Sequence, residues 1–552
     1  MYIKQRRSYM LPRTLILVVY GCFVMRGLFY CAALPNWEGY DEWSHFAVIQ
    51  RMALRGELLV SRSAPISREV ESALRVAPLP WELRHYPPPF KTHDDYWRLN
   101  SEERRQRQAE FYSIDPSFAT QDSSGGLVAY EALQPPLYYW LTTPLYLATN
   151  RFDLGTQLFI LRLFSLAIAS LSIPLMFLVA RSTFHYDPLA AGCAAILSAM
   201  PEFLIDVARV GNECLAVVLF TLLTLLIVDS IRSPLTNCRS LSIGAVLGLG
   251  LLTKAYFLTA LIPAALLLTY EYWRSPGHHR IVLQKALILV LATISIAGWW
   301  YTHNVLTTGT LSGLNEAVVL HGSNTQAGIL KQIVYINWLV PIDAIFLSHL
   351  WFGAWSSLTI RSWMYHLFYL LIMVSSAGLW PLRHSSAVKV LAAFYGAFWI
   401  GQCYNVLLQF VSYGRAASMG WYMYAVAAAE VTLCVAGLRQ FSPPWFAKRV
   451  SFIGVFLFSA LDLYTVNFVA IPYYSGAIQH RDSGALAAVH WADISDLGIG
   501  EIFARLAAFK QGILSGPIIA GLWVIYLAAT LTLIVVSFRH TSEKRSSRLP
   551  SA

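Results

Sequence analysis

The sequence predicts an all-α polytopic membrane protein with about 12 transmembrane helices (11–13) and a large first outer loop that carries short interfacial helices. Of the 552 residues, 56% are hydrophobic and only 13% are charged, a balance that excludes a soluble protein of this length. Hydrophobic spans alternate with basic connectors, so the net charge of +10 lies beside membrane segments. No basic stripe with stacking aromatics is present, and nucleic acid is therefore excluded as a partner.

Charge placement predicts the topology. Cytoplasmic connectors of membrane proteins are enriched in Lys and Arg, and basic residues precede the first span. Spans are predicted near 15–34, 157–181, 188–206, 209–231, 240–253, 255–273, 283–301, 363–381, 388–411, 417–438, 450–470 and 513–537. With the short segment 136–149 as an interfacial helix, every basic connector falls on the cytoplasmic side. We therefore expect both termini in the cytoplasm, although a short tilted crossing by 136–149 stays open.

Four regions follow from this topology. They are the first transmembrane helix (1–34), the first outer loop with interfacial helices (35–150), a catalytic transmembrane module (151–440) and the C-terminal helices with an outer loop at 471–512 (441–552). The stretch from Leu241 to Trp273 is short for two crossings. A tight hairpin with Lys254 at its outer tip keeps the charge pattern, so we prefer it to one long helix.

An acidic, aromatic stretch follows the first span, from Trp37 to Phe46. Alone, it is typical of a wet loop at a membrane surface. The predicted topology, however, places it on the same side as Glu131, the segment 206–213, Lys254, the segment 299–304 and the segment 413–415. Ionisable residues at helix ends within a bundle are costly unless they are paired or functional. The shared side favours one functional site.

This set of residues suits one kind of chemistry. A carboxylate can deprotonate an acceptor hydroxyl, and a cation can neutralise a departing phosphate. The candidate cations and neutralising groups are Lys254, Arg415, Arg209 and His303. No Gly-rich nucleotide-binding loop follows a strand, so a membrane-held lipid phosphate is the expected carrier. The segment His93–Asp95 is a possible metal ligand set, but a helix cap is the better interpretation.

Several motifs, in order along the chain, resemble the GT-C superfamily of polyprenyl-phosphate-sugar-dependent glycosyltransferases. The nearest group is that of the protein O-mannosyltransferases and the lipid A aminoarabinose transferases. The motifs are Asp41-Glu42-x-x-His45-Phe46, Glu131-x-x-Gln134-Pro135-Pro136-Leu137-Tyr138-Tyr139, Pro201-Glu202-Phe203 with Arg209-x-x-Asn212-Glu213, Leu251-Leu252-Thr253-Lys254, Gly298-Trp299-Trp300-Tyr301-x-x-Asn304 and Gly414-Arg415. Two departures stand out: Glu213 where Asp is usual, and Ala416 where Tyr is usual.

The resemblance implies a role for each residue of the candidate site. Asp41 and Glu42 would be catalytic, with Asp41 as the base or a metal ligand. Donor phosphate would be bound by Lys254, Arg209 and Arg415. Donor or acceptor would be oriented by His45, Glu131, Asn212 and His303. A divalent cation on Asp41 and Glu213 is implied for some members of the superfamily only, so no cofactor is certain.

We therefore expect a glycosyltransferase of the cytoplasmic (inner) membrane. It would move a sugar from a polyprenyl-phosphate donor to a hydroxyl of a glycan, lipid or protein acceptor at the outer face, with inversion. One alternative is a transporter or flippase of lipid-linked glycans, which predicts inverted repeats and polar residues at the midplane. Another is an O-antigen polymerase or ligase, against which the early Asp-Glu motif speaks.

Overall fold

The structure is a computed structural model that describes residues 12–86, 89–313, 326–510 and 512–542. The basic residues predicted to hold the termini in the cytoplasm lie partly outside these ranges, at 1–11 and 543–552. The described chain is almost entirely helical. Its one sheet pairs two very short parallel strands, β1 (Pro78–Leu79) and β2 (Lys91–Thr92).

Ten helical segments in the described ranges are long and apolar enough to cross a membrane. They are formed by α1 (Pro12–Ala33), α7 (Leu154–Ser170) with α8 (Ser172–Phe184), α11 (Glu213–Arg232), α13 (Leu261–Arg274), α14 (His279–Thr308), α18 (Ser362–Leu379), α19 (Ser386–Tyr413), α20 (Ala427–Phe441), α22 (Val450–Thr465) with α23 (Ile471–Tyr474), and α26 (Gly516–Ser542). The predicted all-α polytopic membrane fold is confirmed.

The predicted count of twelve crossings is not confirmed. An eleventh span forms if α9 (Asp187–Ala199) and α10 (Pro201–Val207) are taken together. The counterpart of the remaining predicted span, α12 (Asn237–Leu251), has only 15 residues. The predicted interfacial segment 136–149 forms α6 (Leu137–Thr149), which is not among the candidate spans.

Two features differ from the predicted helices. The helix predicted over 188–206 is bent by 67° between α9 and α10. Pro201 stands at the break, where its missing N–H and its ring prevent a regular continuation of α9. The apolar helix α17 (Leu339–Leu350) is too short to be recognised as a span and was not predicted.

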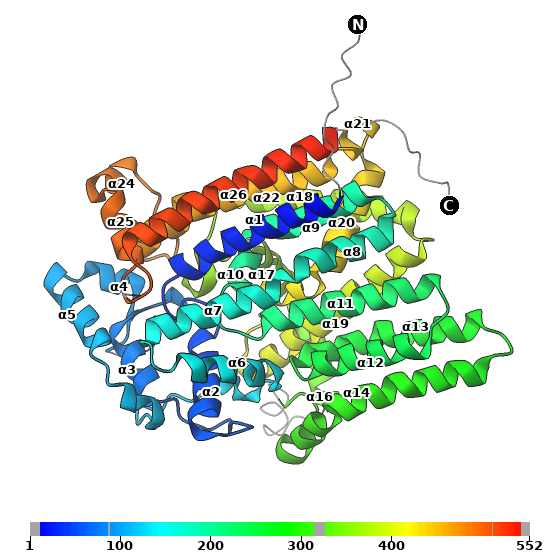
Figure 1. The fold of residues 1–552 in the computed structure, drawn as a ribbon, viewed down its shortest axis with the longest axis horizontal. Coiled ribbons are helices and arrows are strands. Elements are labelled where there is room, and N and C mark those ends of the chain that lie inside the picture. The colour runs from blue at the N-terminus through cyan, green and yellow to red at the C-terminus, as the bar shows by residue number, and fades with distance from the viewer. Residues whose placement is uncertain (1–11, 87–88, 314–325, 511, 543–552) are drawn as a thin grey trace, which may run out of the picture.

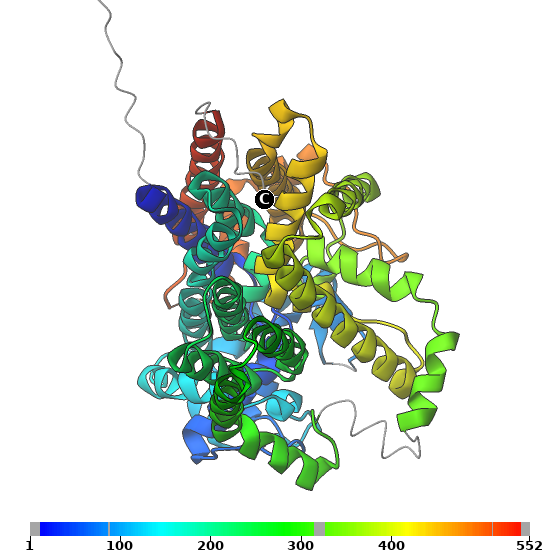
Figure 2. The same cartoon turned by 90° about the vertical axis from the view of Figure 1, so that its right-hand side faces the viewer.

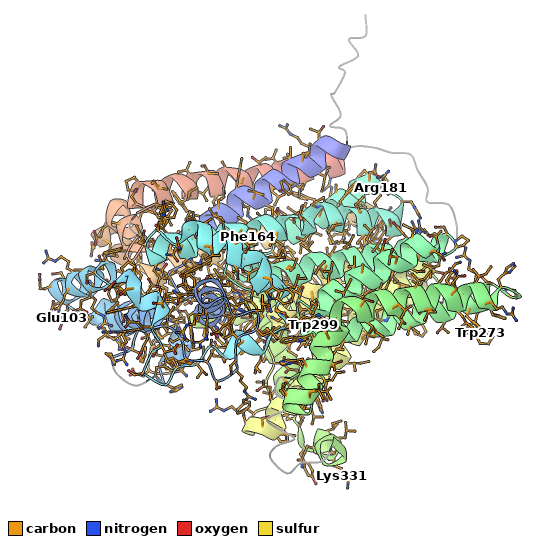
Figure 3. The ribbon with its side chains drawn as sticks, turned by 60° about the horizontal axis from the view of Figure 1, so that its bottom comes forward. Glu103, Phe164, Arg181, Trp273, Trp299 and Lys331 are labelled. Atoms are coloured by element: carbon orange, nitrogen blue, oxygen red, sulfur yellow. The ribbon has the colours of Figure 1, made fainter. Side chains whose placement is uncertain are left out.

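Most of the small helices gather at one end of the bundle, called here the loop end (Figure 1). They are α2 (Glu42–Arg55), α3 (Arg68–Val76), α4 (His93–Arg98), α5 (Ser101–Tyr112), α24 (Trp491–Leu497) and α25 (Ile499–Leu506). Elsewhere lie α16 (Gln326–Lys331) and α21 (Pro444–Ala447). Glu103 marks the loop end in Figure 3, and Arg181 and Trp273 lie at the opposite end. The start of α1 and the end of α26 also lie opposite the loop end.

The helices divide into two groups when the bundle is seen end-on (Figure 2). The blue-to-green helices of the first half stand on one side, and the lime-to-yellow helices stand on the other. The red helix α26 returns to lie beside α1, as it also does in Figure 1. The first and last helices of the described chain, α1 and α26, therefore lie side by side in the bundle.

A buried polar cluster joins α1 to the later helices. Arg26 forms an ion pair with Asp462 of α22 at 2.9 Å, and both side chains are fully buried. The hydroxyls of Tyr30 and Tyr526 donate to the same carboxylate at 2.5 and 2.7 Å. Arg26 also donates to the carbonyl of Ala199 at 3.2 Å. Because that carbonyl is freed by the break between α9 and α10, Arg26 stabilises the bend.

Candidate active site at the loop end

Asp41 stands immediately before α2 in the left-handed backbone region, with φ 57° and ψ 16°. Few non-glycine residues adopt this conformation, and such strain is concentrated at functional sites. The side chain does not cap α2. Its Oδ1 accepts a hydrogen bond from the Tyr130 hydroxyl at 2.7 Å. Asp41 as a whole residue is partly exposed.

Glu131 lies in the 3₁₀ turn Tyr130–Leu133. The backbone N–H of Glu131 donates a hydrogen bond to Ser44 Oγ of α2 at 3.0 Å. Its side chain is 12% exposed. Burial, and next the negative charge of Asp41, raise the pKa of Glu131 to about 8. At neutral pH, Glu131 is therefore a neutral acid that offers an O–H donor.

His45 faces the same space from the first turn of α2. Its Nδ1 lies 2.9 Å from the hydroxyl of Tyr139, which itself donates to the Glu131 carbonyl at 3.1 Å. Burial, and then the charges of Arg209 and Lys254, hold the pKa of His45 well below its ordinary value. The imidazole is therefore neutral, and we assign its proton to Nδ1 because the tyrosine hydrogen is already used.

Two buried cations form the next wall. Arg209 pairs with Asp206 at 3.0 Å and with Glu213 at 2.7 Å. Lys254 forms a close ion pair with the other oxygen of Glu213. Lys254 precedes a second 3₁₀ turn at Ala255–Ala260, where the chain breaks between α12 and α13. The predicted separation of these two helices at Lys254 is therefore confirmed.

Hydrogen bonds and aromatic contacts fix these cations against the other walls. Arg209 donates to the carbonyl of Tyr40, the residue before Asp41, at 2.6 Å. Asn212 donates to the carbonyl of Thr253 at 3.2 Å. Lys254 lies 5.2 Å from the ring of Tyr422. Asp41, His45, Glu131, Arg209, Glu213 and Lys254, called here the acidic site, thus come from four distant segments of the chain.

Glu42 is occupied by structural contacts. Its two oxygens accept hydrogen bonds from Arg162 at 2.7 and 2.6 Å, and the backbone N–H of Val210 also donates to it at 3.0 Å. Both side chains of the Arg162–Glu42 pair are almost fully buried. Arg162 was not among the predicted site residues. A single arginine within a predicted apolar helix nevertheless indicates a paired or functional charge.

Two predicted donor-binding or orienting residues stay outside this network. Arg415 is exposed in the loop after α19, and His303 is exposed on α14 with its ring 5.9 Å from that of Trp300. Among the described residues, neither side chain has an ion pair or a hydrogen bond with the acidic site. Their predicted roles remain predictions.

The implied divalent cation finds no fitting ligand set. In the described ranges, no group of three or more His, Cys, Asp and Glu side chains is arranged to hold a metal ion. Glu213, one of the two expected ligands, has its carboxylate bridged by Arg209 and Lys254. Two cations at that carboxylate oppose a third positive charge there.

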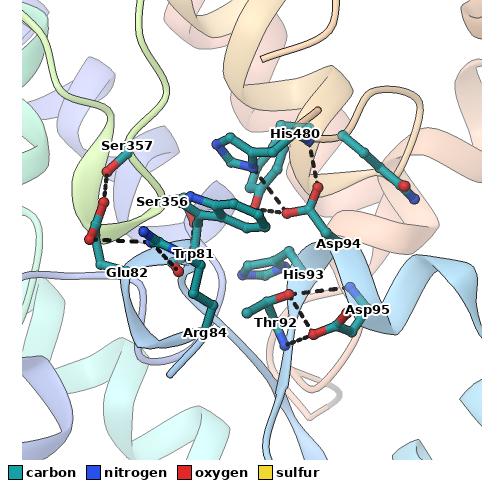
Figure 4. A network of polar contacts seen from close by, with 12 residues as sticks. Trp81, Glu82, Arg84, Thr92, His93, Asp94, Asp95, Ser356, Ser357 and His480 are labelled. Atoms are coloured by element: carbon teal, nitrogen blue, oxygen red, sulfur yellow. Dashed lines mark hydrogen bonds and ion pairs between the residues drawn. The ribbon is translucent and has the colours of Figure 1, made fainter. Parts of the chain in front are cut away.

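A second polar cluster connects the first loop to the 471–512 loop and is drawn in Figure 4. Asp94 accepts hydrogen bonds from the Tyr473 hydroxyl at 2.8 Å, the His480 backbone at 2.6 Å and His480 Nδ1 at 3.0 Å. Trp81 stacks on the His480 ring at 4.3 Å. Burial alone would raise the pKa of Asp94, but the His480 contacts lower it overall. These four residues are called the loop clamp.

The segment His93–Asp95 thus has a structural use. Asp95 and Thr92 form a reciprocal capping box at the start of α4, which confirms the predicted helix cap. His93 contacts Glu38 at 3.2 Å.

The fold and its apolar helices define a multi-pass α-helical membrane protein. No protein-family model and no curated protein matches the chain. Among solved structures it is similar to ArnT from Cupriavidus metallidurans bound to undecaprenyl phosphate, with 14% identity, a TM-score of 0.42, and coverage of 95% of this chain and 77% of that chain. The apo structure of ArnT matches with the same identity and coverage and a TM-score of 0.40.

Proposed function

We propose that this protein is a glycosyltransferase that moves a sugar from a polyprenyl-phosphate donor to an acceptor hydroxyl. The observation that carries the proposal is the strained, partly exposed Asp41, held next to a neutral Glu131 and two buried cations. A base beside cations suits the attack of a hydroxyl with a phosphate as leaving group.

In the proposed mechanism, Asp41 takes the proton of the acceptor hydroxyl. The acceptor oxygen forms a bond to the anomeric carbon while the bond from that carbon to the phosphate oxygen breaks. The electron pair of the broken bond stays on the phosphate. A single displacement with one base and no covalent intermediate inverts the anomeric carbon.

Lys254 is proposed to stabilise the departing phosphate. An ammonium has three N–H donors, so the pair with Glu213 leaves donors for a phosphate oxygen. Arg209 holds Glu213 and the Tyr40 carbonyl, and so aligns the cation with the base. His45, Glu131 and Asn212 are proposed to orient the donor sugar or the acceptor, and Arg415 and His303 to contact the donor from the exposed rim.

We place this reaction at the outer face of the cytoplasmic membrane, with both termini in the cytoplasm. The proposal agrees with the loop end lying opposite the start of α1 and the end of α26. It also agrees with Arg181, a predicted cytoplasmic connector residue, lying opposite Glu103.

The test uses purified protein in lipid vesicles with radiolabelled polyprenyl-phosphate sugars and an extract of envelope glycans, lipids and proteins. Transfer of label to an acceptor by the native protein, and its loss in Asp41→Asn, is the expected result. Movement of intact donor between leaflets without transfer would indicate a flippase instead. Full transfer by Asp41→Asn would overturn the proposed base.

A further inference from the structure

A cavity of about 100 Å³ lies within the helical bundle and shares no lining residue with the acidic site. Its walls come from α9, α17, α18, α20 and α22. All the lining residues are apolar except His349 and Glu430.

Helix packing explains why a space remains here. On one side, α18 approaches α20 through two glycines, and a Cβ added to Gly378 would lie 2.0 Å from the Gly437 carbonyl oxygen. Small residues permit such close approach of membrane helices. On the other side, α18 meets α22 through the rings of Phe368 and Phe458, with centroids 4.9 Å apart. The bulky aromatic contact separates α18 from α22, and the cavity lies between them.

Two of the helices that line the cavity also have faces that are exposed on the outside of the bundle. On α18, Met373 is 68% exposed, and on α22, Phe456 is 49% exposed. Both belong to candidate membrane spans, so we expect their exposed faces to contact lipid tails. A ligand for this cavity is therefore available from the membrane itself.

The polar corner of the cavity has an unused acceptor. His349 Nε2 lies 3.0 Å from Glu430 Oε1, and His349 Nδ1 lies 3.1 Å from the carbonyl of Gly420. The second oxygen of Glu430 is buried and has no partner among the described residues, and Glu430 as a whole is 9% exposed. A buried acceptor without a donor is destabilising, so this oxygen favours a ligand that brings one.

We propose that the cavity binds the hydrocarbon chain of a membrane lipid, with a hydroxyl or amide donor of that lipid bonded to Glu430. The apolar walls hold the chain, and Glu430 selects a chain that carries a hydrogen-bond donor. This binding site does not depend on the proposed transferase activity.

A hydrogen bond and an aromatic stack connect this cavity to the segment next to the acidic site. The Gly420 N–H donates to Ser348 Oγ at 2.7 Å, next to His349. Gly420 starts the 3₁₀ turn Gly420–Val426, in which Trp421 stacks on Tyr40 at 3.7 Å. A lipid held at Glu430 thereby supports the segment that carries Tyr422.

The test is photolabelling of the purified full chain in phospholipid vesicles. The two probes are a long-chain alcohol with a diazirine in its chain and the methyl ether of the same alcohol. We expect the native protein to be labelled in α18, α20 and α22, with about tenfold more labelling by the alcohol than by the ether, as one hydrogen bond to a buried acceptor predicts. Glu430→Met should remove this preference.

Matched variants separate the cavity from the lipid-facing surface. Leu371→Trp on α18 and Leu457→Trp on α22 fill the cavity and should suppress labelling. Their neighbours Leu370→Trp and Phe456→Trp point to the membrane and should leave labelling unchanged. Either filling variant suffices if the other does not fold. Equal labelling in filling and control variants, or no labelling of the native protein, would overturn the proposal.

Discussion

The acidic site and the loop clamp lie at the same end of the molecule, and both combine an aspartate, a histidine and aromatic rings. They differ in how completely the aspartate is satisfied. Asp94 has both oxygens bonded and is fully buried. Among the residues that the structure describes, only Tyr130 donates a hydrogen bond to the Asp41 side chain, and Asp41 is partly exposed in a strained conformation. A satisfied carboxylate stabilises a fold, whereas an available one can do chemistry.

The charges around the two aspartates sharpen the contrast. The contacts of Asp94 with His480 lower its pKa against the effect of burial. Near Asp41, the carboxyl of Glu131 has its pKa raised to about 8, because it is buried and faces a second negative charge. The charged form of Asp94 is therefore stabilised by its contacts, whereas that of Glu131 is destabilised by its surroundings. Mutations in the two clusters should therefore affect different properties.

The largest expected effect comes from Asp41→Asn. Loss of the base should lower kcat by about 10²–10⁴-fold, with the melting temperature nearly unchanged. The matched change Asp94→Asn should leave kcat within about threefold and lower the melting temperature. Both are measured by transfer assays on purified protein and by thermal unfolding. The reverse pattern would contradict the division of roles.

The next effect is on donor binding. Lys254→Met should raise the KM for the polyprenyl-phosphate sugar by about 100-fold, since a charged contact to the phosphate is lost. Lys254→Arg keeps the charge and should recover part of the affinity. Arg415→Ala, at an exposed position, should raise KM less. Equal KM values in native protein and Lys254→Met would exclude Lys254 as a phosphate contact.

A stability test addresses the loop clamp. His480→Ala removes the side-chain hydrogen bond to Asp94 and the stack on Trp81, and should lower the free energy of unfolding by about 1–3 kcal/mol. The backbone bond from His480 to Asp94 can persist, so the loss is partial. His85→Ala, at an exposed position, serves as the control and should have no measurable effect. A large loss of kcat in His480→Ala at unchanged stability would assign the clamp to catalysis.

The smallest effect is a pH dependence set by Glu131. Its pKa is about 8 when folded and near its ordinary value of 4.5 when unfolded. The folded protein therefore holds this proton more tightly, and the stability linked to it is fully present below pH 4.5 and lost as pH rises through about 8. We expect the melting temperature to fall between pH 6 and pH 9, and to fall less in Glu131→Gln. Identical pH profiles for the two proteins would contradict the raised pKa.

Much of the fold could be predicted because hydrophobic length and flanking charge are local signals. The break at Lys254 followed from the same logic. The bend at Pro201 did not, since a proline inside an apolar run can also start a new turn. The short apolar helix α17 also went unrecognised, because length was the criterion for a span.

The candidate site could be assembled from the sequence only as a set of residues on one side. The predicted topology placed Asp41, Glu131, Arg209 and Lys254 on one side of the membrane. It did not predict which side chains form ion pairs or hydrogen bonds with one another. That Glu42 is held by Arg162 depends on two helices meeting, which no local pattern reports. The exposed positions of Arg415 and His303 likewise depend on packing between distant helices.

The buried pair of Arg26 and Asp462 has a consequence for biosynthesis. Arg26 enters the membrane with the first helix, whereas its counterion is made more than four hundred residues later. Until α22 inserts, an unpaired guanidinium has to be tolerated within the bilayer or shielded by another protein. A chain shortened before α22 would keep that unpaired charge, and quality-control proteases should remove it. Whether Arg26 in the first helix is paired with Asp462 thus distinguishes a complete bundle from an incomplete one.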